Sequence, residues 1–158
     1  MISMATIATA LPRKEGRSFL LSKLPLRSRR ILVVEDDVDL RIPIERVTRS
    51  IDPELELDWA SEVSSACWLL QHETYELVLA DYNLGEGPNG VSLYRHCARA
   101  HPRTRFALMS AYLLRDDVRS AIGGPFPFLP KPFTMTGCRT FLREALAHPA
   151  VRGRSTEA

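Results

Sequence analysis

Short apolar runs alternate with amphipathic stretches along the chain from residue 30 onward. The apolar runs are the expected β-strands, and they cover residues 31–35, 55–60, 77–81, 106–110 and 126–129. The stretches between them repeat their apolar positions every three or four residues, which is typical of helices with one buried face. These expected helices cover residues 38–50, 61–72, 89–100, 114–122 and 133–147. Five repeats of a strand followed by a helix predict an α/β fold with a parallel sheet, written (βα)5.

The polarity of the single strands predicts where each one lies in the sheet. Residues 31–34, 77–80 and 106–109 are continuously apolar, as is typical of central parallel strands that helices cover on both faces. Residues 55–60 alternate apolar with charged side chains, which an edge strand tolerates. Pro43 interrupts the first expected helix, and a proline fits a helix only in its first turn. We therefore expect this helix to begin later than its apolar pattern does.

The length and composition of the chain predict one folded domain. It has 158 residues, of which 45% are hydrophobic, and a domain typically holds roughly 100 to 200 residues. Its longest apolar runs are far shorter than the roughly 18 residues that cross a bilayer, so we expect no membrane span. Cys67, Cys97 and Cys138 match neither a disulfide framework nor a zinc site. We expect reduced, packed thiols and a cytoplasmic protein.

The net charge of +2 combines parts of opposite sign. Residues 1–30 hold seven basic residues and one acidic residue, whereas residues 31–148 hold 12 basic and 17 acidic residues. Because the first 29 residues also show no sustained periodicity, we expect a mobile basic arm at 1–29, a folded domain at 30–148 and a tail at 149–158. A secretory signal would place its charges before its apolar stretch, and here the order is reversed. Nucleic acid is expected as a partner only through the arm.

Acidic side chains follow two of the predicted strands at the point where each ends. Glu35 and Asp36 come at the end of the first strand, and Asp81 ends the third. In open parallel sheets, ligands gather at the carboxyl ends of the strands. Carboxylates within about 4 to 6 Å of one another repel, so a cation is needed to keep all of them ionised. Oxygen ligands favour Mg²⁺, with the backbone carbonyl of Asn83 as a further ligand.

Two further strand ends supply groups that suit phosphoryl chemistry. The fourth strand ends at Ser110 and the fifth runs into Lys131. In this arrangement Asp81 is a nucleophile that forms an aspartyl phosphate by in-line attack, while a metal ion neutralises the phosphoryl oxygens. Lys131 would pair with the phosphoryl charge, and Ser110 would donate its hydroxyl to a phosphoryl oxygen.

Four segments carry a resemblance to a known family: 31–37 (ILVVEDD), 79–84 (LADYNL), 108–111 (LMSA) and 128–133 (FLPKPF). Together and in this order they resemble the receiver domain of two-component response regulators, and the resemblance covers about residues 30–148. It implies a flavodoxin-like fold, which is a doubly wound, five-stranded parallel sheet with the strand order 2-1-3-4-5.

The same resemblance implies roles for the site residues. Asp81 takes a phosphoryl group from a histidine kinase or a histidine phosphotransfer protein, and Lys131 and Ser110 sense that group. Movement of Ser110 is coupled to the rotamer of Phe128, which reshapes a partner-binding face. The implied Mg²⁺ ligands are Glu35, Asp36 and Asp81. Such a protein is a phosphoacceptor that assists its own phosphorylation and dephosphorylation, and it is not classed as an enzyme.

Some features depart from the family pattern, and other functions stay open. The loop 85–90 is one residue longer than typical, and Phe128 replaces a frequent tyrosine. Because little chain follows the domain, we expect a stand-alone regulator that docks on a downstream protein of unknown identity. The alternative is a receiver-like module that binds proteins without being phosphorylated. A phosphatase with an aspartate nucleophile commonly needs a second acid two residues later, where this chain has Asn83, and an acidic residue such as Asp37 can simply cap a helix.

Overall fold

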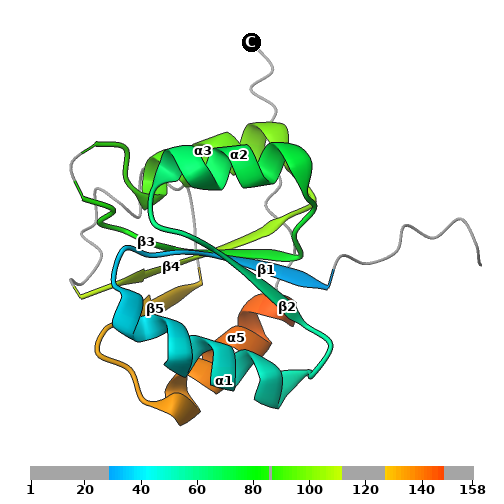
Figure 1. Cartoon of the computed structure of the whole chain (residues 1–158), viewed down its shortest axis with the longest axis vertical. Coiled ribbons are helices and arrows are strands. Elements are labelled where there is room, and N and C mark those ends of the chain that lie inside the picture. Colours follow the sequence, from blue (N-terminus) through cyan, green and yellow to red (C-terminus); the bar gives the residue numbers. More distant parts are fainter. Residues whose placement is uncertain (1–28, 86, 112–126, 148–158) are drawn as a thin grey trace, which may run out of the picture.

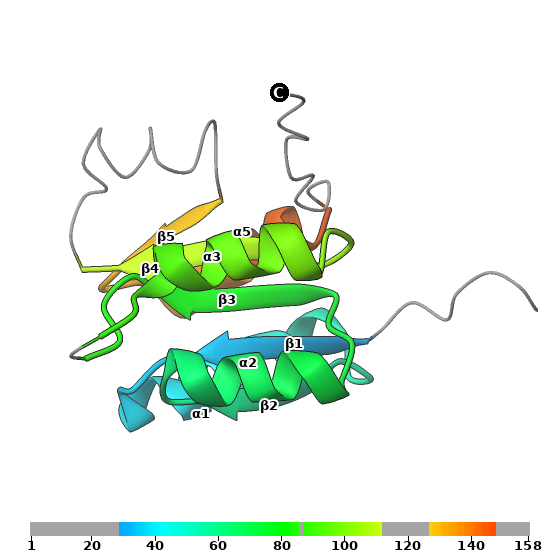
Figure 2. The ribbon, with the colours of Figure 1, turned by 90° about the horizontal axis from the view of Figure 1, so that it is seen from above.

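A single parallel sheet forms the centre of the computed structural model, which describes residues 29–85, 87–111 and 127–147. Its strands are β1 (Arg30–Val34), β2 (Glu56–Ala60), β3 (Leu77–Asp81), β4 (Arg105–Ser110) and β5 (Phe128–Pro130). They lie in the order β2-β1-β3-β4-β5, and every neighbouring pair is parallel (Figure 2). This order confirms the flavodoxin-like fold that the resemblance implies, and it confirms the second strand as an edge.

Helices cover both faces of the sheet (Figure 1). One face carries α1 (Arg41–Ile51) and α5 (Met135–Ala147), and the other carries α2 (Val63–His72) and α3 (Gly90–Ala100). The short 3-10 helix η2 (Val38–Leu40) leads into α1. The expected helix at 114–122, the tail and nearly all of the basic arm lie outside the described residues. Among the helices that are described, none is both long and apolar enough to cross a bilayer.

Many boundaries differ from the sequence prediction by one to three residues, and prolines account for the differences at the starts of α1 and β5. The α-helix begins at Arg41, not at residue 38, so Pro43 lies in its first turn, where backbone N–H groups have no intrahelical partner. This confirms the expected later start. The fifth strand begins at Phe128, two residues later than predicted. Pro127 precedes it and has no N–H to donate, although its carbonyl accepts a hydrogen bond from Leu108 N at 3.0 Å.

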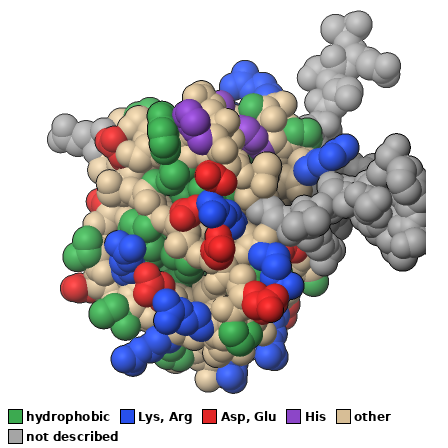
Figure 3. Space-filling view, turned by 45° about the vertical axis from the view of Figure 1, so that its right-hand side comes forward, with side chains coloured by type: hydrophobic (Ala, Val, Ile, Leu, Met, Phe, Trp, Pro, Cys, Tyr) green, Lys and Arg blue, Asp and Glu red, His purple; other side chains and the backbone are tan. Residues whose placement is uncertain are grey.

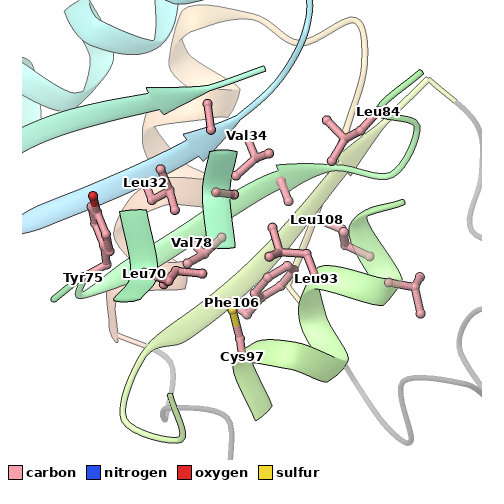
Figure 4. Close-up of a cluster of buried hydrophobic side chains, with 14 residues drawn as sticks. Leu32, Val34, Leu70, Tyr75, Val78, Leu84, Leu93, Cys97, Phe106 and Leu108 are labelled. Carbon is pink, nitrogen blue, oxygen red and sulfur yellow. The ribbon is translucent and has the colours of Figure 1, made fainter. Parts of the chain in front are cut away.

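The core consists of one apolar cluster on each face of the sheet. Alternate residues of β1 point to opposite faces, so Leu32 packs toward α2 and α3, whereas Ile31 packs toward α1 and α5. Figure 4 shows the cluster under α2 and α3, where Val78 and Phe106 of the sheet meet Leu93 of α3. Nearly all residues of β1, β3 and β4 are buried, which confirms that these three strands are central.

The cysteines are free thiols that take part in this packing. Cys97 and Cys138 are buried, and Cys67 is half-buried. Burial raises the pKa of the Cys138 thiol to about 11, and burial with the nearby Cys67 raises that of Cys97 to about 12. The predicted packing is confirmed for Cys97 and Cys138, whereas the reduced state of the thiols stays a prediction.

Candidate functional site

The three predicted acidic residues meet at one end of the sheet. β1 and β3 are neighbours in register, with Val34 opposite Ala80, so the residues that follow these two positions lie side by side. One carboxylate oxygen from each of Glu35, Asp36 and Asp81 lies within 4.8 Å of the other two. Glu35 is only 1% exposed and Asp81 7% exposed, whereas Asp36 is exposed. The site is a buried pair of acids with a third acid at its rim.

Lys131 reaches into this acidic cluster from the end of β5. Its Nζ donates to Asp81 Oδ2 at 2.8 Å and to Glu35 Oε2 at 2.5 Å. Its backbone N–H donates to the carbonyl oxygen of Ser110 at 2.8 Å, which fixes the end of β5 against the end of β4. The peptide bond between Lys131 and Pro132 is cis. The lysine thus contacts acids on two other strand ends, as the strand-end argument predicts.

Burial and hydrogen bonding set the charges of these groups. Burial raises the pKa of Glu35, although its hydrogen bond with Lys131 counteracts part of this effect. Burial on its own would lower the pKa of Lys131, but the hydrogen bonds to Asp81 and Glu35 outweigh it and leave that pKa raised. Lys131 is therefore a cation at neutral pH. One ammonium group does not balance three carboxylates, so the cluster attracts a further cation.

The remaining predicted residues lie at the same end of the sheet or along β5. Ser110 ends β4 and is buried, and Asn83 is exposed in the loop two residues after Asp81. Phe128 pairs with Leu108 of β4 and packs, half-buried, against the core cluster under α2 and α3. Ser110 and Asn83 therefore lie at the end of the sheet that carries the carboxylates, whereas Phe128 lies at the beginning of β5.

Trp59 is a site neighbour that the sequence analysis did not single out. Its indole Nε1 donates to the backbone carbonyl oxygen of Glu35 at 2.9 Å. The backbone N–H of Glu35 is also bonded to β2, because it donates to the carbonyl oxygen of Ala60 at 2.9 Å. An aromatic residue near the end of an edge strand gives no signal of such a bond, because the bond depends on how β2 pairs with β1.

Gly90 is the second neighbour that sequence reasoning missed. It is the first residue of α3, and a Cβ at this position would lie 2.4 Å from the carbonyl oxygen of Asp81 and 2.7 Å from Leu108 Cδ2. Asn89 caps the helix through its side chain, which accepts hydrogen bonds from the backbone N–H groups of Val91 and Ser92. An Asn-Gly pair at a helix start was a visible signal for the cap, but not for the close approach to Asp81.

The donor atoms of the cluster fit a hard divalent cation. Carboxylate oxygens are the ligands that Mg²⁺ prefers, and Mg²⁺ commonly takes one or two carboxylates together with water and phosphate oxygens. Across residues 29–85, 87–111 and 127–147, this is the one group of three or more acidic, histidine or cysteine side chains close enough to share an ion.

Two histidines lie at the opposite end of the sheet from this cluster: His72 ends α2, and His101 follows α3. Figure 3 brings the side where β1 begins toward the viewer and shows histidines together with interspersed acidic and basic side chains.

A five-stranded sheet with the order 2-1-3-4-5, carrying acids on two strand tips and a lysine on a third, defines a receiver-type domain. The sequence model of the response regulator receiver domain matches residues 31–143, and the chain belongs to this family. The matched range falls inside residues 30–148, the predicted bounds of the domain, which stay a prediction. Receiver domains are phosphoacceptors of two-component signalling, and phosphoryl acceptance is general for the family.

Individual relatives agree with this assignment. The chain is 32% identical over 116 residues to the response regulator protein PilR of Pseudomonas aeruginosa. The matched region covers 73% of this chain and 25% of PilR. It thus spans about a quarter of the length of this curated relative. The solved receiver domain of NtrX from Brucella abortus is 26% identical with a TM-score of 0.61, covering 74% of this chain and 98% of NtrX's. A response regulator from Thermotoga maritima, 21% identical with a TM-score of 0.64, shares the fold over 75% of this chain and 98% of its own.

Proposed function

We propose that Asp81 accepts a phosphoryl group from a histidine kinase or a histidine phosphotransfer protein, and that this event changes the surface that a downstream protein binds. The observation that carries the proposal is the 2.8 Å contact between Lys131 Nζ and Asp81 Oδ2 inside a cluster of three carboxylates. The ammonium group of Lys131 is already next to the buried Asp81 carboxylate, so it could stabilise the negative charge of a phosphoryl group formed there.

In the transfer step, a carboxylate oxygen of Asp81 attacks the phosphorus of the donor phosphohistidine. The phosphorus–nitrogen bond breaks, and its electron pair returns to the imidazole nitrogen. Lys131 lies within hydrogen-bond distance of Asp81 and would follow the charge onto the phosphoryl oxygens. Ser110, at the end of the neighbouring strand, would donate its hydroxyl to another of these oxygens.

Glu35, Asp36 and Asp81 are the residues that would hold Mg²⁺, with the backbone carbonyl of Asn83 as a further ligand. Bound there, the ion would supply positive charge to neutralise the phosphoryl oxygens. The exposed position of Asp36 leaves the rim of the cluster open to solvent, from which the ion and a donor enter.

Signalling would pass along β4 and β5. The backbone N–H of Lys131 donates to the carbonyl of Ser110, so a shift of Ser110 toward a phosphoryl group moves the end of β5. Phe128 pairs with Leu108 at the start of β5 and is half-buried. We infer that its position alters the face offered to a downstream protein.

Three exposed apolar side chains lie close in sequence to the site residues. Val38 is 75% exposed, Ile42 61% and Met135 45%, and all three lie within a few residues of the site acids or of Lys131 in the sequence. We propose that these side chains contact a protein donor when it docks. The three free thiols support a reducing compartment, which we propose is the cytoplasm.

The test is incubation with Mg²⁺ and acetyl phosphate, followed by intact-mass measurement. Wild type should gain one phosphoryl group, and Asp81→Asn should gain none. Asp39→Asn is the matched control, because Asp39 is exposed, near the site and outside the acid cluster, and it should be modified like wild type. Modification of Asp81→Asn would point to another acceptor. No modification of any protein, together with no Mg²⁺ binding, would favour a module that binds proteins without phosphorylation.

A further inference from the structure

Trp59 holds the backbone that joins two of the acids, and we propose that it is a positioning residue for the Mg²⁺ ligands Glu35 and Asp36. This inference rests on the proposed function, because it concerns the same cluster. It goes beyond that function by assigning a role to the edge strand β2, none of whose side chains belongs to the acidic cluster.

Each of the four polar atoms of Glu35 has its own partner. The backbone N–H donates to Ala60 O at 2.9 Å, and the carboxylate accepts from Asp37 N at 3.2 Å through Oε1 and from Lys131 Nζ at 2.5 Å through Oε2. The fourth atom, the carbonyl oxygen, accepts from Trp59 Nε1 at 2.9 Å. Within the residues that the structure covers, the indole is the side chain that fixes the main chain at this point.

The position of that bond decides what it orients. The carbonyl oxygen of Glu35 belongs to the planar peptide unit that continues into Asp36. A hydrogen bond to this oxygen therefore fixes the plane from which the Asp36 backbone departs. Asp36 is exposed and follows the last residue of β1 by two positions, so the sheet no longer holds it. The bond from Trp59 orients Asp36 without contacting its carboxylate.

Trp59 is itself held in place by core packing and by Arg41. Its ring is partly buried against the core cluster under α1 and α5. The guanidinium carbon of Arg41 lies 6.0 Å from the ring centroid, and Arg41 Nε donates to Glu45 Oε1 at 3.2 Å. A side chain packed in this way loses little further freedom on making its hydrogen bond, and partners that orient metal ligands commonly contribute roughly 10- to 100-fold to metal affinity.

The decisive variant is Trp59→Phe, which keeps an aromatic ring and removes the N–H donor. We expect Mg²⁺ alone, titrated by calorimetry, to bind roughly tenfold more weakly, at the lower end of the range because the tie acts through the backbone. At saturating Mg²⁺, the extent of phosphorylation by acetyl phosphate should return to the wild-type level. Trp68→Phe is the matched control, since Trp68 is exposed on α2, and its Mg²⁺ affinity should equal that of wild type.

A merely structural role of Trp59 predicts a different result. In that case the thermal midpoint of the metal-free variant falls while Mg²⁺ affinity stays unchanged, and this outcome would overturn the inference alone. Absence of Mg²⁺ binding by wild type would overturn the proposed function and this inference together.

A second measurement covers the case in which Trp59→Phe does not fold. In Trp68→Phe protein, the remaining indole N–H belongs to Trp59 and is visible by NMR. Its exchange with solvent should be slowed, and its resonance should shift when Mg²⁺ is added. An indole proton that exchanges freely with solvent, and whose resonance does not shift when Mg²⁺ is added, would contradict the proposal.

Discussion

Gly90 begins α3 so close to Asp81 that a single added methyl group should disturb both the fold and the site. In Gly90→Ala, the Cβ would lie 2.4 Å from the Asp81 carbonyl oxygen and 2.7 Å from Leu108 Cδ2. Ordinary contacts between such atoms are about 3.5 Å or longer, so backbone or core must shift by about an ångström. Overpacking of this kind costs about 1 to 3 kcal/mol, and the better helix propensity of alanine returns up to about 1 kcal/mol. We expect a net loss of about 1 to 2 kcal/mol.

The assay is urea unfolding of wild type, Gly90→Ala and the matched variant Gly137→Ala. Gly137 also lies in the first turn of a helix, α5, and is exposed, and its Cβ would meet only Thr134 Oγ1 at 3.2 Å. Its unfolding free energy should stay within about 1 kcal/mol of wild type. Because the Gly90 methyl group presses on the peptide unit that carries Asp81, the phosphorylated fraction should fall in Gly90→Ala only. Equal stability and equal phosphorylation of the two variants would refute the steric argument.

Three further outcomes follow from the same contacts. Mg²⁺ should raise the thermal midpoint of wild type but not of Asp36→Asn, since a ligand that binds only the folded state stabilises it; equal shifts would remove Asp36 from the ligand set. Alkylation near pH 8 should modify Cys67 before Cys97 and Cys138, because burial raises the pKa of the last two thiols to about 12 and about 11, and their thiolates form only as the pH approaches those values. Mass analysis of timed samples checks this order. Lys131→Met should lower the metal-free unfolding free energy by about 2 to 3 kcal/mol, because buried carboxylates lose their cation; an unchanged urea midpoint would contradict that.

The elements of this fold could be predicted from the sequence because their signals are local. Continuous apolar runs gave β1, β3 and β4 as central strands, and the mixed polarity of β2 gave an edge. The order of the strands was different, since periodicity does not say which strands pair, and only the resemblance to receiver domains implied it. The beginning of β5 was misplaced because apolar Phe126 and Phe128 flank Pro127, and hydrophobicity alone does not show that the ladder starts after the proline.

The site was predictable in part for a similar reason. In a parallel sheet, residues that follow neighbouring strands share one edge, so Glu35, Asp81 and Lys131 could be brought together from their places in the sequence. Trp59 and Gly90 could not, because their importance depends on distances that exist only after β2 pairs with β1 and α3 packs on β3. Both residues lie against the backbone of a site acid, and the type of a residue does not indicate which backbone atoms it will contact.

The charges of the acidic cluster predict that phosphorylation of Asp81 depends on a divalent ion. With its three carboxylates ionised, the cluster of Glu35, Asp36, Asp81 and Lys131 carries two net negative charges, and an aspartyl phosphate in place of the Asp81 carboxylate adds about one more. Such charge is costly in a buried site, so chelation of divalent ions by EDTA should abolish phosphorylation by acetyl phosphate. Added Mg²⁺ should restore it, and phosphorylation in EDTA would contradict this count. Because Lys131 already contacts two acids, an ion held by Glu35 would release it toward the phosphoryl group, and its backbone bond to Ser110 would carry that movement into β4.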